Sequence, residues 1–264
     1  MTSQKEKTIL ITGACGFVGK HLVNHLLRKN ICSKIIVCCR DMEKAGELYG
    51  SDEKISIATA DLLHPSSYQD IFENNNPRLI IHLAALARFK QGEEYPEETI
   101  KANFLATVKL LETAKRFGVE KFLAASSNLA RNPKGVTGIS KFLTEAYVKQ
   151  YVEPPETISI RLPNVAGSKG SVSRIFKQQI EKNAPITITD PRMSRKFITP
   201  REAAHELLFA LENGNHGDIF INNKPSTPIV DLAKEMIEQS GKKNTAPLHW
   251  HACRRKITGS RLSG

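Results

Sequence analysis

The sequence predicts an α/β fold, in which helices cover a doubly wound parallel sheet and a small C-terminal region is attached. Short β-branched runs alternate with segments of helical period between residues 7 and 162. This alternation is typical of parallel sheets with right-handed crossover connections. The chain has 264 residues, of which 40% are hydrophobic and 25% are charged. That length and composition suit one medium α/β domain with an appendage, and they exclude a globally disordered chain.

Five strands of the predicted sheet correspond to short apolar runs. The runs are rich in Ile, Val and Leu, as buried parallel strands are. They span residues 7–12, 34–39, 55–60, 78–85 and 121–126. Helical spacing of apolar residues is clearest at residues 20–29 and 97–117. In such a sheet a ligand binds beyond the C-terminal ends of the strands, so the residues that follow each run are the candidates for a site.

A glycine-rich turn follows the first predicted strand. The segment Gly13-Ala-Cys-Gly16-Phe-Val-Gly19 lies between this strand and a helical segment, which is the context in which glycines mark a dinucleotide site. Gly13 permits a tight turn, Gly16 lets the backbone approach a pyrophosphate, and Gly19 lets the helix pack on the strand. The N–H groups at the start of the helix would face the phosphates. Three further residues of the turn are expected at the cofactor: Cys15, Phe17 and Val18.

The end of the second predicted strand indicates which dinucleotide binds. NAD enzymes commonly place an acid here to bind the ribose hydroxyls, but in this chain Cys38 and Cys39 are followed by Arg40. A guanidinium group can hold a 2′-phosphate through charge-assisted hydrogen bonds. NADP is therefore favoured over NAD. The alternative interpretation is that Arg40 is a solvated charge at the strand end, without a ligand.

The spacing G-x-x-G-x-x-G after Thr12 resembles the short-chain dehydrogenase/reductase superfamily. The resemblance implies a Rossmann fold and an adenine contact at Asp61 and Leu62. It also implies small residues under the nicotinamide half of the cofactor, in an H-x-A-A pattern that begins at His82. Three more cofactor contacts are implied by this resemblance: Ala84, Ala85 and Asn103.

Three longer motifs resemble one branch of this superfamily, the extended enzymes of polysaccharide biosynthesis (UDP-N-acetylglucosamine 4,6-dehydratases and C5-epimerases, CapD-like). Residues 126–141, S-S-N-L-A-R-N-P-K-G-V-T-G-I-S-K, are similar to S-T-D-K-A-x-N-P-x-N-x-(Y/M)-G-A-[ST]-K. Residues 161–172 resemble R-x-x-N-V-x-G-S-x-G-S-V, and residues 186–197 resemble V-T-(V/I)-T-x-P-x-M-T-R-x-F. The resemblance implies an NAD(P)-dependent sugar-nucleotide dehydratase or epimerase that acts on a UDP-sugar in surface polysaccharide or glycan biosynthesis.

The resemblance also implies a catalytic group, and this sequence departs from it at three positions. Asn128 and Leu129 replace the Asp and Lys of S-T-D-K, and Thr137 replaces the Tyr or Met. An amide cannot accept a proton as a carboxylate does, and an aliphatic hydroxyl is far less acidic than a phenol. Lys141 is retained, which in the family binds the nicotinamide ribose. The catalytic candidates are Lys141, Thr137, Ser127 and Asn128.

These replacements put ordinary 4,6-dehydratase turnover in doubt, because each lost acid–base group commonly costs about 10²–10⁴-fold in rate. The alternative is a catalytically impaired protein that binds NADP and a nucleotide sugar and has a regulatory or partner role. Both hypotheses keep the same binding residues.

Substrate contacts are implied by the same resemblance. Ala87-Arg88 stands where the branch usually has Lys-His, and Arg88 could meet a sugar or phosphate oxygen. Asn164 and Ser171 match nucleotide-sugar positions, and Arg195 matches a diphosphate ligand. Arg261 lies in a segment that loosely matches a C-terminal T-G-x-R motif, which implies a second phosphate contact. An ordinary basic tail is an equal alternative for Arg261.

The motifs divide the chain into an NAD(P)-binding Rossmann region, residues 1–162, and an interleaved substrate-binding region, residues 163–264. The second region has helical patterns at residues 171–181, 200–211 and 229–239. Segments 97–117 and 137–152 resemble the superfamily's four-helix dimer seam, which implies a homodimer or a larger homo-oligomer.

Composition excludes several other classes. The net charge of +11 comes from dispersed basic residues, and aromatic residues make up 6%, so a phosphorylated ligand is expected and a nucleic-acid partner is not. No apolar run reaches the roughly 18 residues of a membrane span. The polar N-terminus does not have the pattern of a signal peptide. The His and Cys spacings suggest no metal site. The five cysteines, an odd number without framework spacing, predict reduced thiols and a cytoplasmic location.

Overall fold

The computed structural model describes residues 7–168, 170–241, 249 and 250. By their contacts they form two compact units, Met1–Ser168 with Ile198–Asn223, and Lys169–Phe197 with Lys224–Gly264. Residues 198–223 thus belong with the first unit, whereas the sequence places them in the region that begins at residue 163. The division at residue 162 stays a prediction about function.

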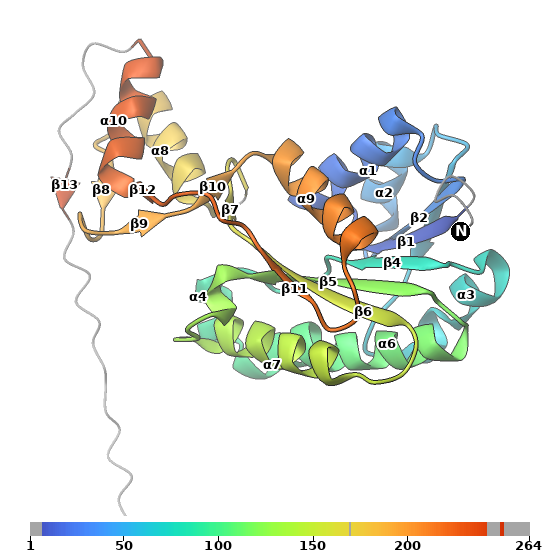
Figure 1. The fold of residues 1–264 in the computed structure, drawn as a ribbon. Helices are drawn as coiled ribbons and strands as arrows, with labels where there is room; N and C mark the ends of the chain where they lie inside the picture. The colour runs from blue at the N-terminus through green and yellow to red at the C-terminus, as the bar shows by residue number, and fades with distance from the viewer. Residues whose placement is uncertain (1–6, 169, 242–248, 251–264) are drawn as a thin grey trace, which may run out of the picture. The chain divides into compact units, whose positions relative to one another are not determined.

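The first unit is built on a seven-stranded parallel sheet (Figure 1), as expected for the predicted fold class. Its strand order is β11-β6-β5-β4-β1-β2-β3. The direction of winding reverses between β1 and β4, and in open α/β sheets that point opens a crevice for ligands. The strands are β1 (Thr8–Thr12), β2 (Lys34–Cys39), β3 (Ile55–Thr59), β4 (Leu79–His82), β5 (Lys121–Ser127), β6 (Glu156–Leu162) and β11 (Ile219–Ile221).

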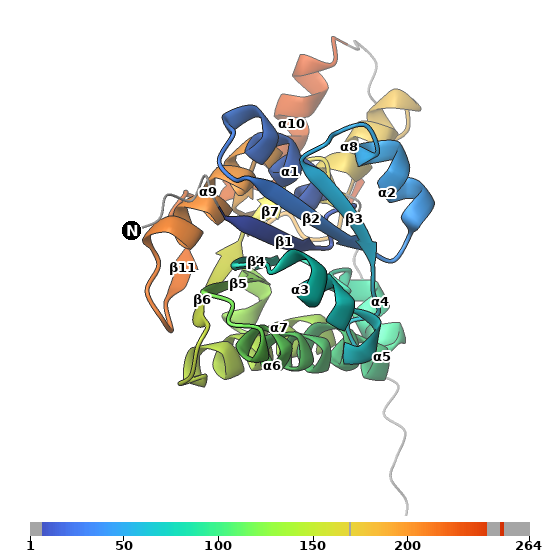
Figure 2. The same cartoon turned by 90° about the vertical axis from the view of Figure 1, so that its right-hand side faces the viewer.

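Helices cover both faces of this sheet (Figure 2). Alternate strand residues point to opposite faces, so Ile9 and Ile11 enter one core cluster and Leu10 enters the other. One face is covered by α1 (Phe17–Lys29), α2 (Met42–Tyr49) and α9 (Pro200–Asn213). The other is covered by α3 (Gln69–Asn75), α6 (Ala106–Arg116) and α7 (Val136–Gln150). Shorter elements are η2 (Pro65–Ser67), α4 (Phe89–Glu94) and η4 (Asn128–Ala130).

The long helix predicted at residues 97–117 is present and contains one irregular turn. It consists of α5 (Pro96–Ile100), a π-helical turn η3 (Lys101–Leu105) and α6. π-Helical turns inside α-helices are frequent at functional sites. The turn here carries Asn103, whose side chain faces the loop that follows β4.

The second unit is small and has its own core. Its helices are α8 (Val172–Glu181) and α10 (Ile229–Gln239), close to the predicted ranges. They pack around Phe176, Ile180, Ile186 and Ile229. The short strands β9 (Ser194–Arg195) and β12 (Thr227–Pro228) pair antiparallel, and β8 (Thr187–Ile188) pairs with β13 (His249–Trp250). In the first unit, the short strand β7 (Asn164–Val165) pairs with β10 (Phe197–Ile198), whose residue Ile198 belongs to that unit. Among the described residues, no helix has the length and apolar character needed to cross a bilayer.

Candidate functional site

A cavity of about 460 Å³ lies at the C-terminal ends of β1, β2, β3 and β4. This is the reversal point of the sheet, where a crevice is expected. Its walls come from the glycine-rich turn, from the strand ends and from η3. Seven sequence-predicted cofactor residues line it: Gly13, Gly16, Arg40, Asp61, Leu62, Ala84 and Ala85.

The glycine-rich turn is too tightly packed for side chains at its three glycines, and a Cβ at Gly16 would lie 2.9 Å from the carbonyl oxygen of Gly13. Gly13 has a φ of +70°, and a Cβ added to it would lie 2.7 Å from the backbone nitrogen of Ala84. A Cβ at Gly19 would lie 2.5 Å from the carbonyl oxygen of Gly13. These positions therefore need glycine, for the turn at Gly13 and for helix packing at Gly19.

The first turn of α1 presents open N–H groups next to the cavity. Gly16 is the N-cap and offers no side chain as a cap, and the first turn contains no acidic residue. The partial positive charge of the helix N-terminus is thus free to attract an anion. Phe17 and Val18 direct their side chains to the core cluster of α1 and α9, and Cys15 packs there too.

A buried hydrogen-bond chain holds the Ala84 backbone at the cavity wall. Thr12 Oγ1 accepts from Ala84 N (3.3 Å) and is 2.7 Å from His82 Nδ1. His82 Nε2 is 3.0 Å from Thr107 Oγ1, whose hydroxyl donates to the Asn103 carbonyl (2.7 Å). This pattern fits a neutral imidazole that donates from Nε2. Burial lowers the pKa of His82 to about 3, with a smaller effect of the Lys141 charge.

Asn103 is a predicted cofactor residue that the structure places behind the cavity wall. Its Oδ1 accepts from Leu86 N (2.7 Å), and its Nδ2 donates to Leu86 O (3.0 Å) and to Ser140 Oγ (2.9 Å). The side chain thus fixes the loop after β4 to α7, and contact of Asn103 with a cofactor stays a prediction.

Lys141, retained from the family motif, is buried on α7 behind the end of β5. Its side chain is 7% exposed and its Nζ donates to the Ala125 carbonyl (2.7 Å). Burial lowers the pKa of Lys141 to about 8, although the Glu145 carboxylate opposes the shift. Glu145 itself is paired with Arg161, with 2.6 Å between Oε2 and the guanidinium.

The other catalytic candidates lie on adjacent elements. Thr137, on the first turn of α7, is 2% exposed, and its hydroxyl donates to the Arg88 carbonyl (3.4 Å). Ser127 ends β5 and its Oγ accepts from Leu129 N (3.3 Å). Asn128 begins η4, which packs against α7. The structure thus brings these positions together around the β5–α7 connection, and their catalytic roles stay predictions.

A protein-family model described as "Polysaccharide biosynthesis protein" matches residues 9–263. The chain belongs to this family. It is 33% identical over 249 residues to the capsular polysaccharide biosynthesis protein CapD of Staphylococcus aureus, a match that covers 90% of this chain and 41% of CapD. It is 32% identical to a UDP-glucose 4-epimerase of Rickettsia prowazekii, covering 90% of this chain and 72% of that protein. This chain therefore spans less than half the length of CapD.

Solved structures agree on the fold. Pen from Bacillus thuringiensis superposes with a TM-score of 0.87 at 26% identity, covering 96% of this chain and 82% of that chain. A UDP-glucose 4-epimerase from Thermotoga maritima gives a TM-score of 0.78 at 22% identity, covering 93% and 90%. The Rossmann fold and the resemblance to the polysaccharide-biosynthesis branch are both confirmed.

The predicted substrate residues of this family member are divided between the two units. Arg88, at the start of α4, and Asn164, in β7, belong to the first unit. Ser171 caps α8 by accepting from Arg174 N (3.4 Å), and the exposed Arg195 in β9 donates to the Ser194 carbonyl. Arg261 lies outside the described residues. Substrate binding by all five stays a prediction.

The expectation of five reduced thiols is wrong in the described part of the chain, because Cys15 and Cys39 form a disulfide. Parallel pairing of β1 with β2 brings the glycine-rich turn beside the end of β2, a proximity that the spacing of cysteines in the sequence does not reveal. Cys32 and Cys38 are free and buried. Cys38 enters the opposite core cluster from Cys39, as expected for neighbours on a strand.

Sequence reasoning missed two contacts that support the site. The Tyr49 hydroxyl of α2 donates to the Ala14 carbonyl within the glycine-rich turn (2.8 Å). Glu93 of α4 accepts from Val136 N at the start of α7 (2.9 Å). No sequence pattern indicates either contact, because each depends on how a helix packs. The hydrogen-bond chain through His82 is different, since the H-x-A-A pattern marks its position.

Proposed function

We propose that this chain is an NAD(P)-dependent sugar-nucleotide dehydratase or epimerase that acts on a UDP-sugar in surface polysaccharide or glycan biosynthesis. The observation that carries the proposal is the cavity at the sheet's reversal point, lined by seven predicted cofactor residues. The names of two relatives support it, a capsular polysaccharide biosynthesis protein and a UDP-glucose 4-epimerase.

The residues present fit a nicotinamide dinucleotide. Gly13 keeps free the space that a side chain would take at the Ala84 backbone, and the uncapped start of α1 suits a pyrophosphate. Arg40 lines the same cavity and suits the 2′-phosphate of NADP, so NADP is proposed ahead of NAD. A fold neighbour, the Bordetella bronchiseptica enzyme WbmF, was solved in complex with NAD⁺.

A bound nicotinamide dinucleotide supplies a hydride acceptor and donor. In this proposal the first turn of α1 orients the pyrophosphate, Asp61 and Leu62 orient the adenine, and the chain from His82 through Thr12 fixes the Ala84 backbone under the nicotinamide. Lys141, whose Nζ is held by the Ala125 carbonyl, is assigned the acid–base role, and burial lowers its pKa to about 8. Thr137 is assigned a positioning role at the Arg88 carbonyl.

The UDP-sugar is proposed to contact the residues that match the family's substrate positions, namely Arg88, Asn164, Ser171 and Arg195. Arg195 is exposed, and guanidinium groups bind diphosphates through paired charge-assisted hydrogen bonds. Arg261 is proposed as a further phosphate contact. The replacements at Asn128, Leu129 and Thr137 predict that any 4,6-dehydratase turnover is slow.

Proton NMR of the purified full chain with NADP and UDP-N-acetylglucosamine in D₂O tests the proposal. Deuterium at C5, a 4-keto-6-deoxy product or inversion at C4 would support catalysis, and UDP-glucose serves as a second substrate. Saturation-transfer signals from both ligands without any chemical change would identify the alternative, a nucleotide-sugar-binding protein without turnover. If neither ligand gives a signal, the proposal is wrong.

We further propose that the chain acts in the cytoplasm as a homodimer or larger homo-oligomer, without a nucleic-acid partner. The exposed apolar side chains of η3 and α7 support the oligomer, because exposed apolar patches commonly mark interfaces. They are Leu105, Ile139, Phe142 and Leu143.

A further inference from the structure

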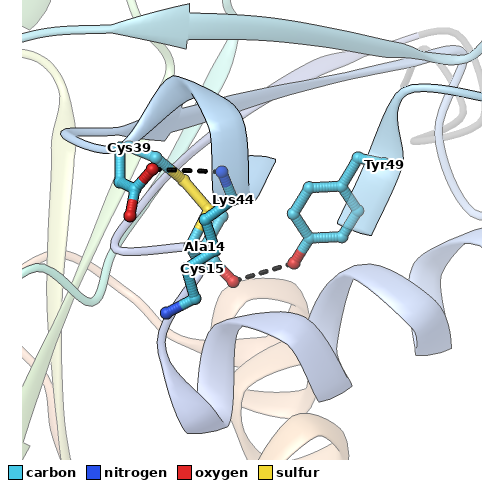
Figure 3. Close-up of a disulfide and its surroundings, with 6 residues drawn as sticks. Ala14, Cys15, Cys39, Lys44 and Tyr49 are labelled. Atoms are coloured by element: carbon cyan, nitrogen blue, oxygen red, sulfur yellow. Dashed lines mark hydrogen bonds between the residues drawn. A yellow bond between two sulfur atoms is a disulfide. The ribbon is translucent and has the colours of Figure 1, made fainter. Parts of the chain in front are cut away.

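The disulfide between Cys15 and Cys39 connects two parts of the proposed dinucleotide site (Figure 3). Cys15 lies in the middle of the glycine-rich turn, and Cys39 ends β2 immediately before Arg40. Their Cα atoms are 6.2 Å apart, although 24 residues separate them in sequence. In dinucleotide-binding sheets the turn holds the pyrophosphate and the end of the second strand holds the ribose. The bridge thus links the two elements that would grip the adenosine half of the cofactor.

The bridge lies on the core side of the turn and leaves the cavity open. Cys39 is 6% exposed and belongs to the core cluster beneath α1 and α2, against which Cys15 also packs. The cavity of about 460 Å³ exists in this bridged state, and its walls include Gly13, Gly16 and Cys39. The disulfide therefore holds the turn in place without filling the space in which a ligand would bind.

A second contact, a hydrogen bond from α2, also restrains the glycine-rich turn. The Tyr49 hydroxyl donates to the carbonyl of Ala14, next to Cys15 (Figure 3). With the bridge closed, a covalent bond and a hydrogen bond fix two successive residues of the turn. With the bridge open, the hydrogen bond from Tyr49 remains and the covalent restraint on Cys15 is lost.

We propose that Cys15 and Cys39 form a reversible redox switch that sets the affinity of the chain for its dinucleotide. The bridged form holds the turn in the shape that makes the cavity, and so it binds more tightly. The dithiol form has to order the turn when the ligand binds, and such ordering weakens affinity. This inference rests on the proposed function, in which the cavity binds NADP.

The oxidant is a low-molecular-weight disulfide such as glutathione disulfide. Cys15, the more exposed of the two, loses its proton and attacks one sulfur of that disulfide, whose S–S bond breaks and releases one glutathione thiolate. The thiolate of Cys39 then attacks the Cys15 sulfur of the mixed disulfide and releases the second glutathione thiolate. The protein loses two protons and two electrons, and one glutathione disulfide becomes two glutathione thiols.

The two free cysteines of the described chain provide built-in controls. Burial raises the pKa of Cys32 to about 11 and that of Cys38 to about 12, so both stay protonated and unreactive near neutral pH. Cys32 is also outside the residues that line the cavity. Cys253 lies outside the described residues, and the test therefore uses a Cys253→Ser background.

The test measures NADP binding by calorimetry for the full chain, once after reduction with dithiothreitol and once after oxidation with glutathione disulfide. Intact mass after thiol alkylation counts the free cysteines in each sample. We expect the oxidised chain to bind NADP roughly three- to tenfold more tightly. Cys15→Ser and Cys39→Ser should each abolish the difference between the two samples, and Cys32→Ala should keep it.

Linkage supplies a second readout that a merely structural disulfide would not give. If oxidation tightens NADP binding, NADP must favour the oxidised pair by the same factor. For this two-electron couple, a three- to tenfold effect lowers the reduction potential of the pair by about 15–30 mV at saturating NADP. Redox titration in glutathione buffers, with and without NADP, measures that shift.

The outcomes separate the switch from the proposed function. Equal affinities for verified dithiol and disulfide samples would overturn the switch and leave dinucleotide binding intact. Weaker binding after oxidation, or a pair that does not form under glutathione disulfide, would also overturn it. Binding in neither sample would overturn the proposed function itself.

Discussion

Thr12 Oγ1 and His82 Nδ1 lie 2.7 Å apart in the buried chain of hydrogen bonds that holds the Ala84 backbone. Thr12→Val removes the hydroxyl but keeps the side-chain shape, and it leaves His82 Nδ1 and Ala84 N without this partner. Leaving buried polar groups unpaired costs about 1–3 kcal/mol each. We expect the free energy of unfolding to fall by about that amount, as measured by urea denaturation. Thr59→Val, at the exposed end of β3, is the control and should change stability by less than about 0.5 kcal/mol.

His82 makes stability depend on pH. Its pKa is lowered from 6.5 to about 3 in the folded chain because burial disfavours the charged imidazolium. Between these values the unfolded chain binds more protons than the folded chain, so stability falls as the pH falls from 6.5 towards 3. The contribution of His82 is at most about 1.4 kcal/mol per pH unit.

His82→Gln should reduce this slope, and His64→Gln should not, because His64 is 70% exposed. Urea denaturation from pH 7 to pH 4.5 gives both slopes. A slope that is unchanged by His82→Gln would contradict the assignment of a neutral, buried imidazole.

Arg40 decides between the two dinucleotides. A guanidinium bonded to the 2′-phosphate contributes about 1.5–3 kcal/mol, so Arg40→Ala should weaken NADP binding about tenfold to hundredfold. NAD lacks this phosphate, and its affinity should change by less than about twofold on the same reasoning. Arg28→Ala, in the last turn of α1, is the charge-matched control. An equal loss of affinity for NAD and NADP would show that Arg40 acts on something the two ligands share.

The cavity could be predicted largely from the sequence, because its walls are strand ends. The apolar runs locate the strands, and in a parallel sheet their C-terminal ends meet at one edge. Gly13, Arg40 and Asp61 each follow such a run, Ala84 lies near the end of another, and the structure places all four around one cavity. The glycine spacing adds the turn, since a Cβ at Gly13 has no room.

Contacts that depend on helix packing could not be predicted in this way. The disulfide from Cys15 to Cys39 joins residues 24 apart, and nothing in the spacing of five cysteines indicates that pair. Asn103 matched a cofactor position, but it lies in a π-helical turn that has no sequence signature, and its amide bonds to the Leu86 backbone. Thr137 is buried because α4 packs on the start of α7.

Lys141 is expected to be needed for turnover and, at the same time, to lower the free energy of unfolding. Its buried ammonium group has its pKa lowered from 10.5 to about 8 by desolvation. Replacing a buried charge with an apolar side chain of similar length is often neutral or stabilising, so Lys141→Met should raise the free energy of unfolding at pH 7 by on the order of 1–3 kcal/mol. Turnover in the NMR assay should be lost in the same variant.

The pH dependence of stability shows whether the gain in Lys141→Met comes from removing a buried charge or from a general change in packing. Below pH 8 Lys141 is charged in both states, and between pH 8 and 10.5 the folded chain binds fewer protons than the unfolded chain. Stability of the wild type should therefore rise through that window relative to Lys141→Met. Lys149→Met, at the exposed end of α7, should follow the wild type. A Lys141→Met variant that is less stable at every pH would contradict the burial of a charged amine.

Phe142, which is 47% exposed on α7, tests the proposed homodimer. Together with Ile139 and Leu143 it leaves apolar surface open on a helix that also carries Lys141. Pairing with the same surface of a second copy would bury this patch, as isologous interfaces do. A carboxylate there would have to be buried next to its own copy, so Phe142→Asp should convert a dimer to a monomer in light scattering after size exclusion. Met42→Asp, equally exposed on α2, should leave the dimer intact, and a wild type that is monomeric at all concentrations would contradict the interface.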